Sequence, residues 1–233
     1  MQTWTIKALL EWITPYLTDK EVDAPRLCAE MLVCHVLKKQ RIDLYTQFDW
    51  VVPQAQLEQL RALIKRAGAH EPVAYLVGKT EFYSLELEIG PDCLIPRPET
   101  ELLVQHAIET LRARPDEQRV LDLCTGSACI AVALGKNHEQ SSITASDISE
   151  PALKIAQMNV QKHKLDERIE LRQGDLFEPV TGQVFDMIVS NPPYVSDSEY
   201  EKLEQNVKAF EPRLALHAGA QGLDLYERIL HQM

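Results

Sequence analysis

The chain has 233 residues, of which 45% are hydrophobic, and its formal net charge is −11. This length is enough to bury a core in one large domain plus a small one. No apolar run approaches the ~20 residues of a membrane-spanning helix, and the start lacks the basic-then-apolar order of a secretory signal. We therefore expect a cytoplasmic protein without a membrane partner.

The acidic charge is unevenly distributed. Residues 1–75 carry nine basic and nine acidic side chains, so the whole excess lies in the later part. A domain that binds a phosphate backbone normally carries the opposite sign, which argues against nucleic acid as a direct substrate, with a local basic face left open. The five cysteines are scattered and form no C-x-x-C pair, so free thiols and no metal site are expected.

The first 71 residues predict a small helical bundle. Apolar residues recur at helical spacing in residues 9–17 and 57–64. Asp23 before Pro25 predicts a capped helix start between these two segments. Residues 72–98 are rich in β-formers, with apolar and acidic side chains alternating at 85–89, and predict a hairpin linker.

Residues 99–233 alternate strands with helices. The predicted strands are 119–124, 142–147, 168–175 and 185–191, and the predicted helices are 128–138, 151–163 and 198–208. This alternation indicates a parallel sheet covered on both faces. Ligands of such folds bind at the carboxyl ends of the strands.

Three consecutive strand ends suit one nucleoside. The first strand leads into a short loop made of Cys124, Thr125, Gly126, Ser127 and Ala128. A loop of this kind lets backbone N–H groups approach a ligand, although alone it equally fits an ordinary strand-to-helix turn. Asp147 ends the second strand about twenty residues later, where a carboxylate accepts hydrogen bonds from ribose hydroxyls. Asp175 and Leu176 end the third strand and suit an adenine ring, as acceptor and apolar wall.

The fourth strand ends in Asn191, Pro192, Pro193 and Tyr194. Proline cannot donate to a sheet ladder and restricts the residue before it, so the strand stops at Asn191 and its amide faces what lies beyond. With the preceding loops, this motif resembles the class I S-adenosylmethionine-dependent methyltransferases. Within them it resembles enzymes that methylate a planar amide or an exocyclic nitrogen.

The resemblance extends over essentially the whole chain. The stretches "EPVAYLVGKTEFYSLELEIGPDCLIPRPETELLV", "FEPRLAL" and "GLDLYERI" are similar to the HemK/PrmC family of protein-(glutamine-N5) methyltransferases. The resemblance implies an α/β fold: a Rossmann-like methyltransferase domain at 99–233, a β-hairpin linker and a helical substrate-recognition domain. It also implies S-adenosyl-L-methionine as cofactor, and as protein substrate the glutamine of the Gly-Gly-Gln loop in class-one peptide chain release factors.

The acceptor chemistry then gives the strand-end motif a role. A primary amide nitrogen is a poor nucleophile because its lone pair is delocalised. We expect the Asn191 side-chain oxygen and the Pro192 carbonyl each to accept one N–H, with Tyr194 packed on the flat face of the amide. Asn191 is also a candidate cofactor contact. Positioning of the amide should contribute more to the rate than the hydrogen bonds themselves, because a fixed near-attack geometry supplies ~7–11 kcal/mol.

Two departures from the family pattern matter. Ala128 stands where the family usually has glycine, and a positive φ there would cost roughly 1 kcal/mol or more. The family also continues through three more strands after the last residue of this chain. We therefore expect a C-terminally incomplete domain in which Met187, Ile188 and Val189 are exposed on an uncovered edge strand.

The segment before the domain carries a further set of candidates. Arg97, Glu99, Thr100 and Glu101 open the helix that leads into the domain, and Thr100 is a candidate cap. Two explanations for these four residues stay open: they form a helix start, or they contact the cofactor or the substrate. For the whole chain, three alternatives stay open: methylation of an amino group on a flipped nucleic-acid base, methylation of a ribosomal-protein glutamine, and a non-catalytic cofactor-binding module.

Overall fold

The computed structural model describes residues 3–114 and 116–233. The chain divides into two compact units, Met1–Gly78 and Lys79–Met233, each with its own hydrophobic core. Among the described residues, no helix combines the length and the apolar character needed to cross a membrane.

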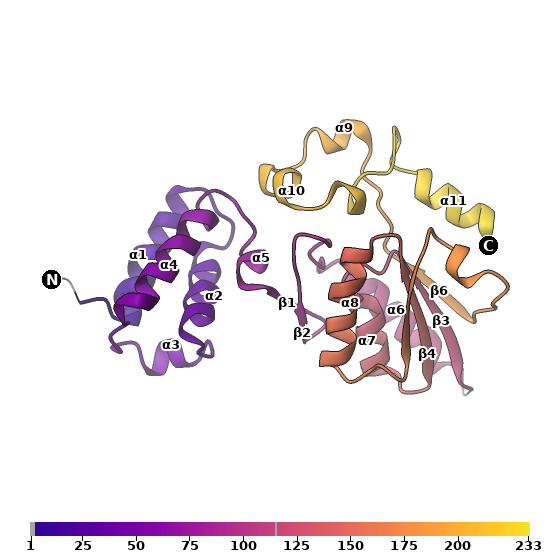
Figure 1. Cartoon of the computed structure of the whole chain (residues 1–233), viewed down its shortest axis with the longest axis horizontal. Helices are drawn as coiled ribbons and strands as arrows, with labels where there is room; N and C mark the ends of the chain where they lie inside the picture. Colours follow the sequence, from indigo (N-terminus) through magenta and orange to yellow (C-terminus); the bar gives the residue numbers. More distant parts are fainter. Residues whose placement is uncertain (1–2, 115) are drawn as a thin grey trace. The chain divides into compact units, whose positions relative to one another are not determined.

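The first unit is a helical bundle (Figure 1). Its helices are α1 (Ile6–Asp19), α2 (Pro25–Leu37), α3 (Asp43–Thr46), α4 (Gln54–Ala67) and α5 (Val73–Val77). The predicted apolar stripes face its core: Ile13 and Leu17 of α1 are fully buried, and Leu60 of α4 is 1% exposed. The helical expectation for this unit is confirmed.

Two local expectations for this part of the chain are wrong. Asp23 does not cap α2; Ala24 holds the N-cap position with a φ of 44° and no side-chain hydrogen bond. The fixed φ of Pro25 is already suited to a first helical turn, so the helix begins without a polar cap. Residues 73–77, expected within the hairpin segment, form α5 instead and end at Gly78, whose φ of 75° stops the helix.

The second unit begins with the hairpin and continues into a parallel sheet. Antiparallel β1 (Lys79–Phe82) and β2 (Leu85–Glu88) precede four parallel strands: β3 (Gln118–Leu123), β4 (Ser141–Asp147), β5 (Ile169–Gln173) and β6 (Met187–Ser190). The strand order is β5-β4-β3-β6. The order therefore reverses beside β3, and doubly wound sheets bind ligands at such a reversal.

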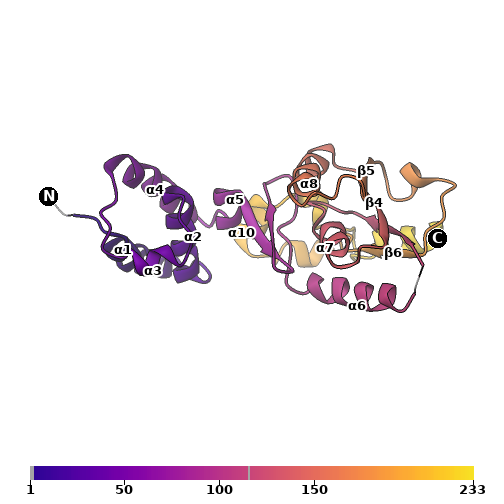
Figure 2. The same cartoon turned by 90° about the horizontal axis from the view of Figure 1, so that it is seen from below.

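Helices cover both faces of this sheet. On one face α6 (Thr100–Arg112), α7 (Cys129–Asn137) and α8 (Glu150–Lys162) share a core with the strands, and Figure 2 shows these three helices in a row. On the other face Leu121 and Leu123 pack with Ile229 of α11 (Asp224–Gln232) and with the short helix η1 (Glu178–Val180).

The edge strand β6 is better covered than we expected. Val189 is only 4% exposed, and Met187 and Ile188 are partly buried, each packed against a core cluster. The expectation of exposed side chains is wrong because helices cover both faces of this strand. Ile188 packs in the cluster that contains Ile229 of α11, and Met187 and Val189 pack in the cluster shared with α6 and α7.

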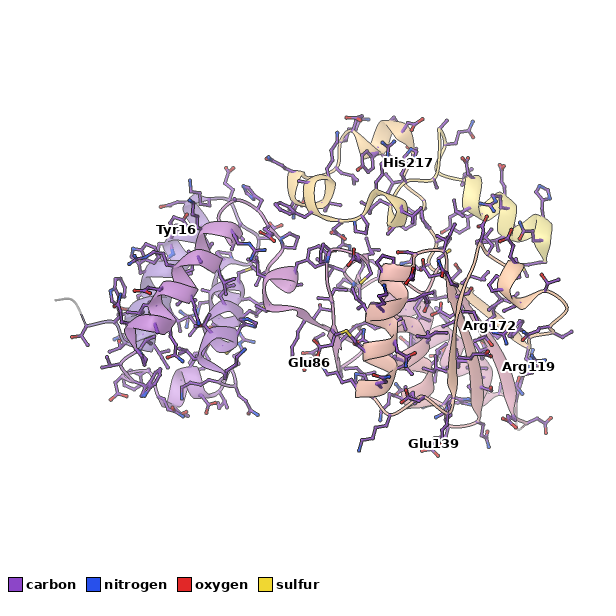
Figure 3. All side chains as sticks on the ribbon, viewed as in Figure 1. Tyr16, Glu86, Arg119, Glu139, Arg172 and His217 are labelled. Atoms are coloured by element: carbon purple, nitrogen blue, oxygen red, sulfur yellow. The ribbon has the colours of Figure 1, made fainter. Side chains whose placement is uncertain are left out.

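The segment after β6 lies at the carboxyl ends of the strands (Figure 1). Figure 3 shows His217 of this segment at that end and Glu139 at the opposite end. The single helix expected at 198–208 is wrong, because two short helices, α9 (Asp197–Tyr200) and α10 (Gln205–Phe210), occupy the region. Ser196 and Glu199 form a capping box that starts α9, and residues 201–204 separate it from α10.

Asn159 of α8 ties the hairpin to the sheet domain. Its side chain is fully buried, and its Nδ2 donates to the carbonyls of Glu88 and Ser127 at 2.9 Å each. Its Oδ1 accepts from the Glu88 N–H at 2.7 Å. One amide therefore satisfies three backbone groups from β2 and from the loop that follows β3.

Replacing Asn159 with Ala should leave these three groups unpaired inside the protein. Each unpaired buried group costs about 1–3 kcal/mol, so we expect the free energy of unfolding to fall by at least about 3 kcal/mol. Chemical denaturation measures it, with Gln157→Ala on the exposed face of the same helix as control. A loss below about 1 kcal/mol would contradict the assigned role of Asn159.

Candidate active site

A cavity of about 230 Å³ opens at the carboxyl ends of all four parallel strands. The sequence-predicted residues that line it are Thr100, Cys124, Thr125, Gly126, Ser127, Asp147, Asp175, Leu176, Asn191 and Pro193. A smaller cavity adjoins it and shares Asn191, and its lining includes Arg97, Pro192 and Tyr194. The strand ends thus bring together most of the predicted site.

The loop after β3 is held in an alternating backbone conformation. Cys124, Gly126 and Ala128 have φ values of 58°, 55° and 62°, in the left-handed region. A Cβ atom at Gly126 would meet no atom within 4 Å, so its backbone faces open space in the cavity. The loop therefore exposes backbone where a ligand approaches.

Ala128 is strained but buried. Its positive φ costs an alanine roughly 1 kcal/mol relative to glycine. Its side chain is fully buried in the core between the sheet and the helices and does not line the cavity, whereas its neighbours Ser127 and Cys129 do. The buried methyl group offsets part of the strain, which accounts for alanine at a position that favours glycine.

Asp122 lies directly beneath this loop. Its carboxylate is fully buried, and its Oδ2 accepts from the Thr125 hydroxyl at 2.6 Å. Burial raises the pKa of Asp122 from 3.8 to about 7. The sequence analysis did not single out this residue, because an acid in the middle of a strand gives no sign that it is shielded from water.

Asp147 joins the ends of two strands. Its Oδ2 accepts from the Gly126 N–H at 2.8 Å, and its Oδ1 accepts from the Ser149 N–H at 2.9 Å. Burial raises the pKa of Asp147. A carboxylate has about four acceptor sites, so acceptor capacity remains for a ligand in the cavity. Ser149 caps α8 by accepting from the Ala152 N–H.

The end of β5 faces a residue that the sequence analysis missed. Asp175 forms an ion pair with Arg228 of α11, and both side chains line the cavity. Leu176 is 5% exposed and packs in the core cluster that includes Ile229. No local sequence pattern in α11 indicates that Arg228 lines the cavity, because the position of Arg228 depends on how this helix packs back onto the sheet.

Asn191 stands at the junction of the two cavities. Its Nδ2 donates to the Thr100 hydroxyl at 3.2 Å, which turns the amide nitrogen toward α6 and leaves Oδ1 on the other side. Tyr194 is 54% exposed at the smaller cavity. Its carbonyl lies under Gly222, where a Cβ atom would approach it to 2.3 Å.

The residues before α6 separate into different roles. Thr100 is the first helical residue, and the N-cap is Glu99, which is exposed and forms no capping hydrogen bond, so the expected Thr100 cap is wrong. Glu101 accepts from the Tyr83 N–H at 2.8 Å and thereby holds the hairpin turn. Arg97 pairs with Glu211 at 2.5 Å. Thr100 lines the larger cavity and Arg97 the smaller one.

The fold and the cavity define a class I methyltransferase. The catalytic domain of human METTL16, solved with an RNA hairpin, has a similar fold, with a TM-score of 0.54 and 17% identity over 85% of this chain and 71% of that chain. The family model described as "Methyltransferase small domain" matches residues 98–212, and "PrmC N-terminal domain" matches residues 8–78.

Curated relatives identify the family. The release factor glutamine methyltransferase of Rhodopirellula baltica is 46% identical over 98% of this chain and 78% of its own length. That of Geobacter sulfurreducens is 40% identical over 98% of this chain and 79% of its length. The chain therefore belongs to the release factor glutamine methyltransferase family, as an enzyme that uses S-adenosylmethionine.

Replacing Asp147 with Ala should weaken the binding of S-adenosylmethionine by about 1.5–3 kcal/mol, the range for hydrogen bonds to a charged group. Calorimetric titration gives the dissociation constant. Asp166→Asn, an exposed acid before β5, serves as control. An unchanged dissociation constant would restrict Asp147 to holding Gly126 and Ser149.

The buried carboxylate predicts a pH-dependent stability. The folded chain keeps the Asp122 proton up to about pH 7, whereas the unfolded chain releases it near 3.8, so the folded state binds more protons between these values. The contribution of Asp122 to the free energy of unfolding therefore falls as the pH rises through this window. Asp122→Asn should remove that fall. The free energy of unfolding of the variant, relative to that of wild type, should therefore be higher at about pH 8 than at about pH 5.

Denaturation of the two proteins at both pH values measures this difference. Glu139→Gln, at the opposite end of the strands, is the control because its exposed carboxylate should change neither value. An equal stability difference between wild type and Asp122→Asn at both pH values would contradict the burial argument.

Proposed function

We propose that this chain transfers a methyl group from S-adenosylmethionine to the side-chain amide nitrogen of a glutamine in a peptide chain release factor, in the cytoplasm. The names of the relatives support the release factor as substrate. The observation that carries the chemistry is Asn191, whose amide is oriented by Thr100 at the junction of two cavities. Within the substrate we assign the glutamine of the Gly-Gly-Gln loop.

The larger cavity fits the cofactor. Gly126 leaves open space for close approach, Asp147 retains acceptor capacity for ribose hydroxyls, and Leu176 with Asp175 suits an adenine ring. The residues that would hold the cofactor are Cys124, Thr125, Gly126, Ser127, Asp147, Asp175, Leu176 and Asn191. When bound, S-adenosylmethionine supplies an electrophilic methyl group on a sulfonium centre.

The acceptor glutamine belongs in the smaller cavity. Asn191 Oδ1 and the Pro192 carbonyl each accept one N–H of the primary amide, and Tyr194 packs on its flat face. Pro193 lines the larger cavity and keeps the turn rigid between the two sites. Together these residues direct the nitrogen lone pair toward the cofactor cavity.

Positioning is the larger part of this catalysis. Each neutral hydrogen bond contributes only about 1 kcal/mol in net terms, whereas a fixed near-attack geometry supplies ~7–11 kcal/mol. The methylated nitrogen then releases one proton to water, because an amide protonated on nitrogen is a strong acid. A strong general base is therefore not required at this site.

Radiolabelled methyl transfer tests the proposal directly. Purified release factor should be labelled by the wild-type enzyme, and a release factor whose loop glutamine is replaced by alanine should not. Ribosomal proteins and unmethylated RNA and DNA are assayed in parallel. Label in any of these, with none in the release factor, would contradict the assigned substrate, and cofactor binding without any transfer would indicate a non-catalytic module.

Asn191→Ala should lower kcat at least about a hundredfold, because it removes an acceptor for the reacting nitrogen in the transition state. Cofactor affinity should change less, because seven other residues of the larger cavity also hold the cofactor. Initial rates with release factor give kcat, and Asn206→Ala is the matched control, because Asn206 lies in the same segment and lines neither cavity. Near-normal turnover by Asn191→Ala would remove the basis of the proposed mechanism.

A further inference from the structure

The smaller cavity has few polar side chains. Of its lining residues, only Arg97, Asn191 and Tyr194 carry polar side-chain atoms. The rest of the lining is apolar and consists of Leu94, Pro192, Val195, Ala215 and Leu216. Within the protein, a polar group of an acceptor in this cavity can be satisfied only by these three side chains or by backbone atoms.

A primary amide has three needs in such a cavity. Its two N–H groups require acceptors, which Asn191 Oδ1 and the Pro192 carbonyl supply in the proposed function. Its carbonyl oxygen requires a donor, and a buried carbonyl without one costs about 1–3 kcal/mol. Thr100 takes one N–H of the Asn191 amino group, which lies on the side of that amide away from Oδ1, so the donor for the carbonyl is sought on another side chain.

Arg97 is held in place for such a role. Its Nη2 donates to Glu211 Oε1 at 2.5 Å, and Glu211 Oε2 accepts from the Ile95 N–H at 3.3 Å. The Glu211 side chain is 2% exposed, whereas that of Arg97 is 32% exposed. A guanidinium has five N–H donors in a rigid fork, so Arg97 keeps donors beyond the one bound to Glu211.

We propose that Arg97 donates a hydrogen bond to the carbonyl oxygen of the acceptor amide and that Glu211 is the positioning residue that fixes its guanidinium. The inference rests on the proposed function and adds a specificity-determining residue to it. Two acceptors and one donor then match a primary amide, whereas a carboxylate has no N–H groups to offer. Tyr194 is the competing donor, but its side chain is 54% exposed and Arg97 is anchored by a buried carboxylate.

The role of Arg97 is alignment and not activation. A cation at the carbonyl oxygen draws electron density away from the nitrogen, so it does not make the nitrogen more nucleophilic. What it provides is a third fixed point, which together with Asn191 and Pro192 sets the plane of the amide. Its loss should therefore appear in both the KM for release factor and kcat, and not in cofactor binding.

The test compares Arg97→Met, Arg97→Lys and Glu211→Gln with purified release factor. Arg97→Met should lower kcat/KM about tenfold to a hundredfold, the equivalent of the loss of one donor to a buried carbonyl. Arg97→Lys should recover part of the loss, because an ammonium still donates. Glu211→Gln keeps an oxygen for Arg97 and should stay within about threefold of wild type.

Controls separate alignment from folding. The dissociation constant for S-adenosylmethionine should stay within about twofold in every variant. Arg213→Met, which removes an arginine that stacks on Tyr200 and lines neither cavity, should behave as wild type. Because Arg97→Met leaves the buried Glu211 charge unpaired, Arg97→Met/Glu211→Gln is measured as well and should show the same loss in kcat/KM.

Three outcomes would overturn the proposal. The first is kcat/KM within about threefold of wild type in folded Arg97→Met/Glu211→Gln. The second is an equal loss of cofactor affinity, which would make Arg97 a structural residue. The third is a loss with Tyr194→Phe that Arg97→Met does not show, which would assign the donor to Tyr194. If wild type labels the release factor, these results bear on Arg97 alone; an inactive wild type overturns both proposals.

Discussion

The hydrogen bond from Asn191 to Thr100 is the interaction on which the proposed chemistry depends. The oxygen and the NH2 group of a side-chain amide have nearly the same size and shape, so the orientation of the amide decides whether a ligand meets an acceptor or a donor. Thr100 takes the nitrogen at 3.2 Å and leaves the oxygen for an N–H donor. The two residues are 91 positions apart, so the parallel pairing of β6 and the packing of α6 on the sheet are both needed to bring them together.

The smaller cavity is lined by segments that precede the parallel strands in the chain and by segments that follow them. The ion pair of Arg97 with Glu211 joins residues 114 positions apart, and the Val195 N–H donates to the Leu216 carbonyl. Gly222 passes so close to the Tyr194 carbonyl that a side chain does not fit there. The motif at 191–194 is thus packed against residues that precede it and follow it in the chain, so these four residues depend on a much longer chain for their position.

The sequence predicts what depends on local pattern and chain order. The four parallel strands and the convergence of Asp147, Asp175 and Asn191 follow from alternation, since carboxyl ends of parallel strands share one edge. It does not predict features set by tertiary contacts: the break between α9 and α10, the return of α11 that brings Arg228 to the cavity, and the buried methyl group of Ala128 that offsets its strained φ. A local sequence pattern does not show which distant segment of the chain packs against it.

The orientation of the Asn191 amide is tested most directly at its partner. Thr100→Val keeps the shape of this buried side chain and removes the oxygen that accepts from Asn191 Nδ2, whereas Thr100→Ser keeps that oxygen. Single-turnover rates of methyl transfer to release factor should fall at least about tenfold in Thr100→Val and stay near wild type in Thr100→Ser, with cofactor affinity little changed in both. A wild-type rate in Thr100→Val would contradict the account.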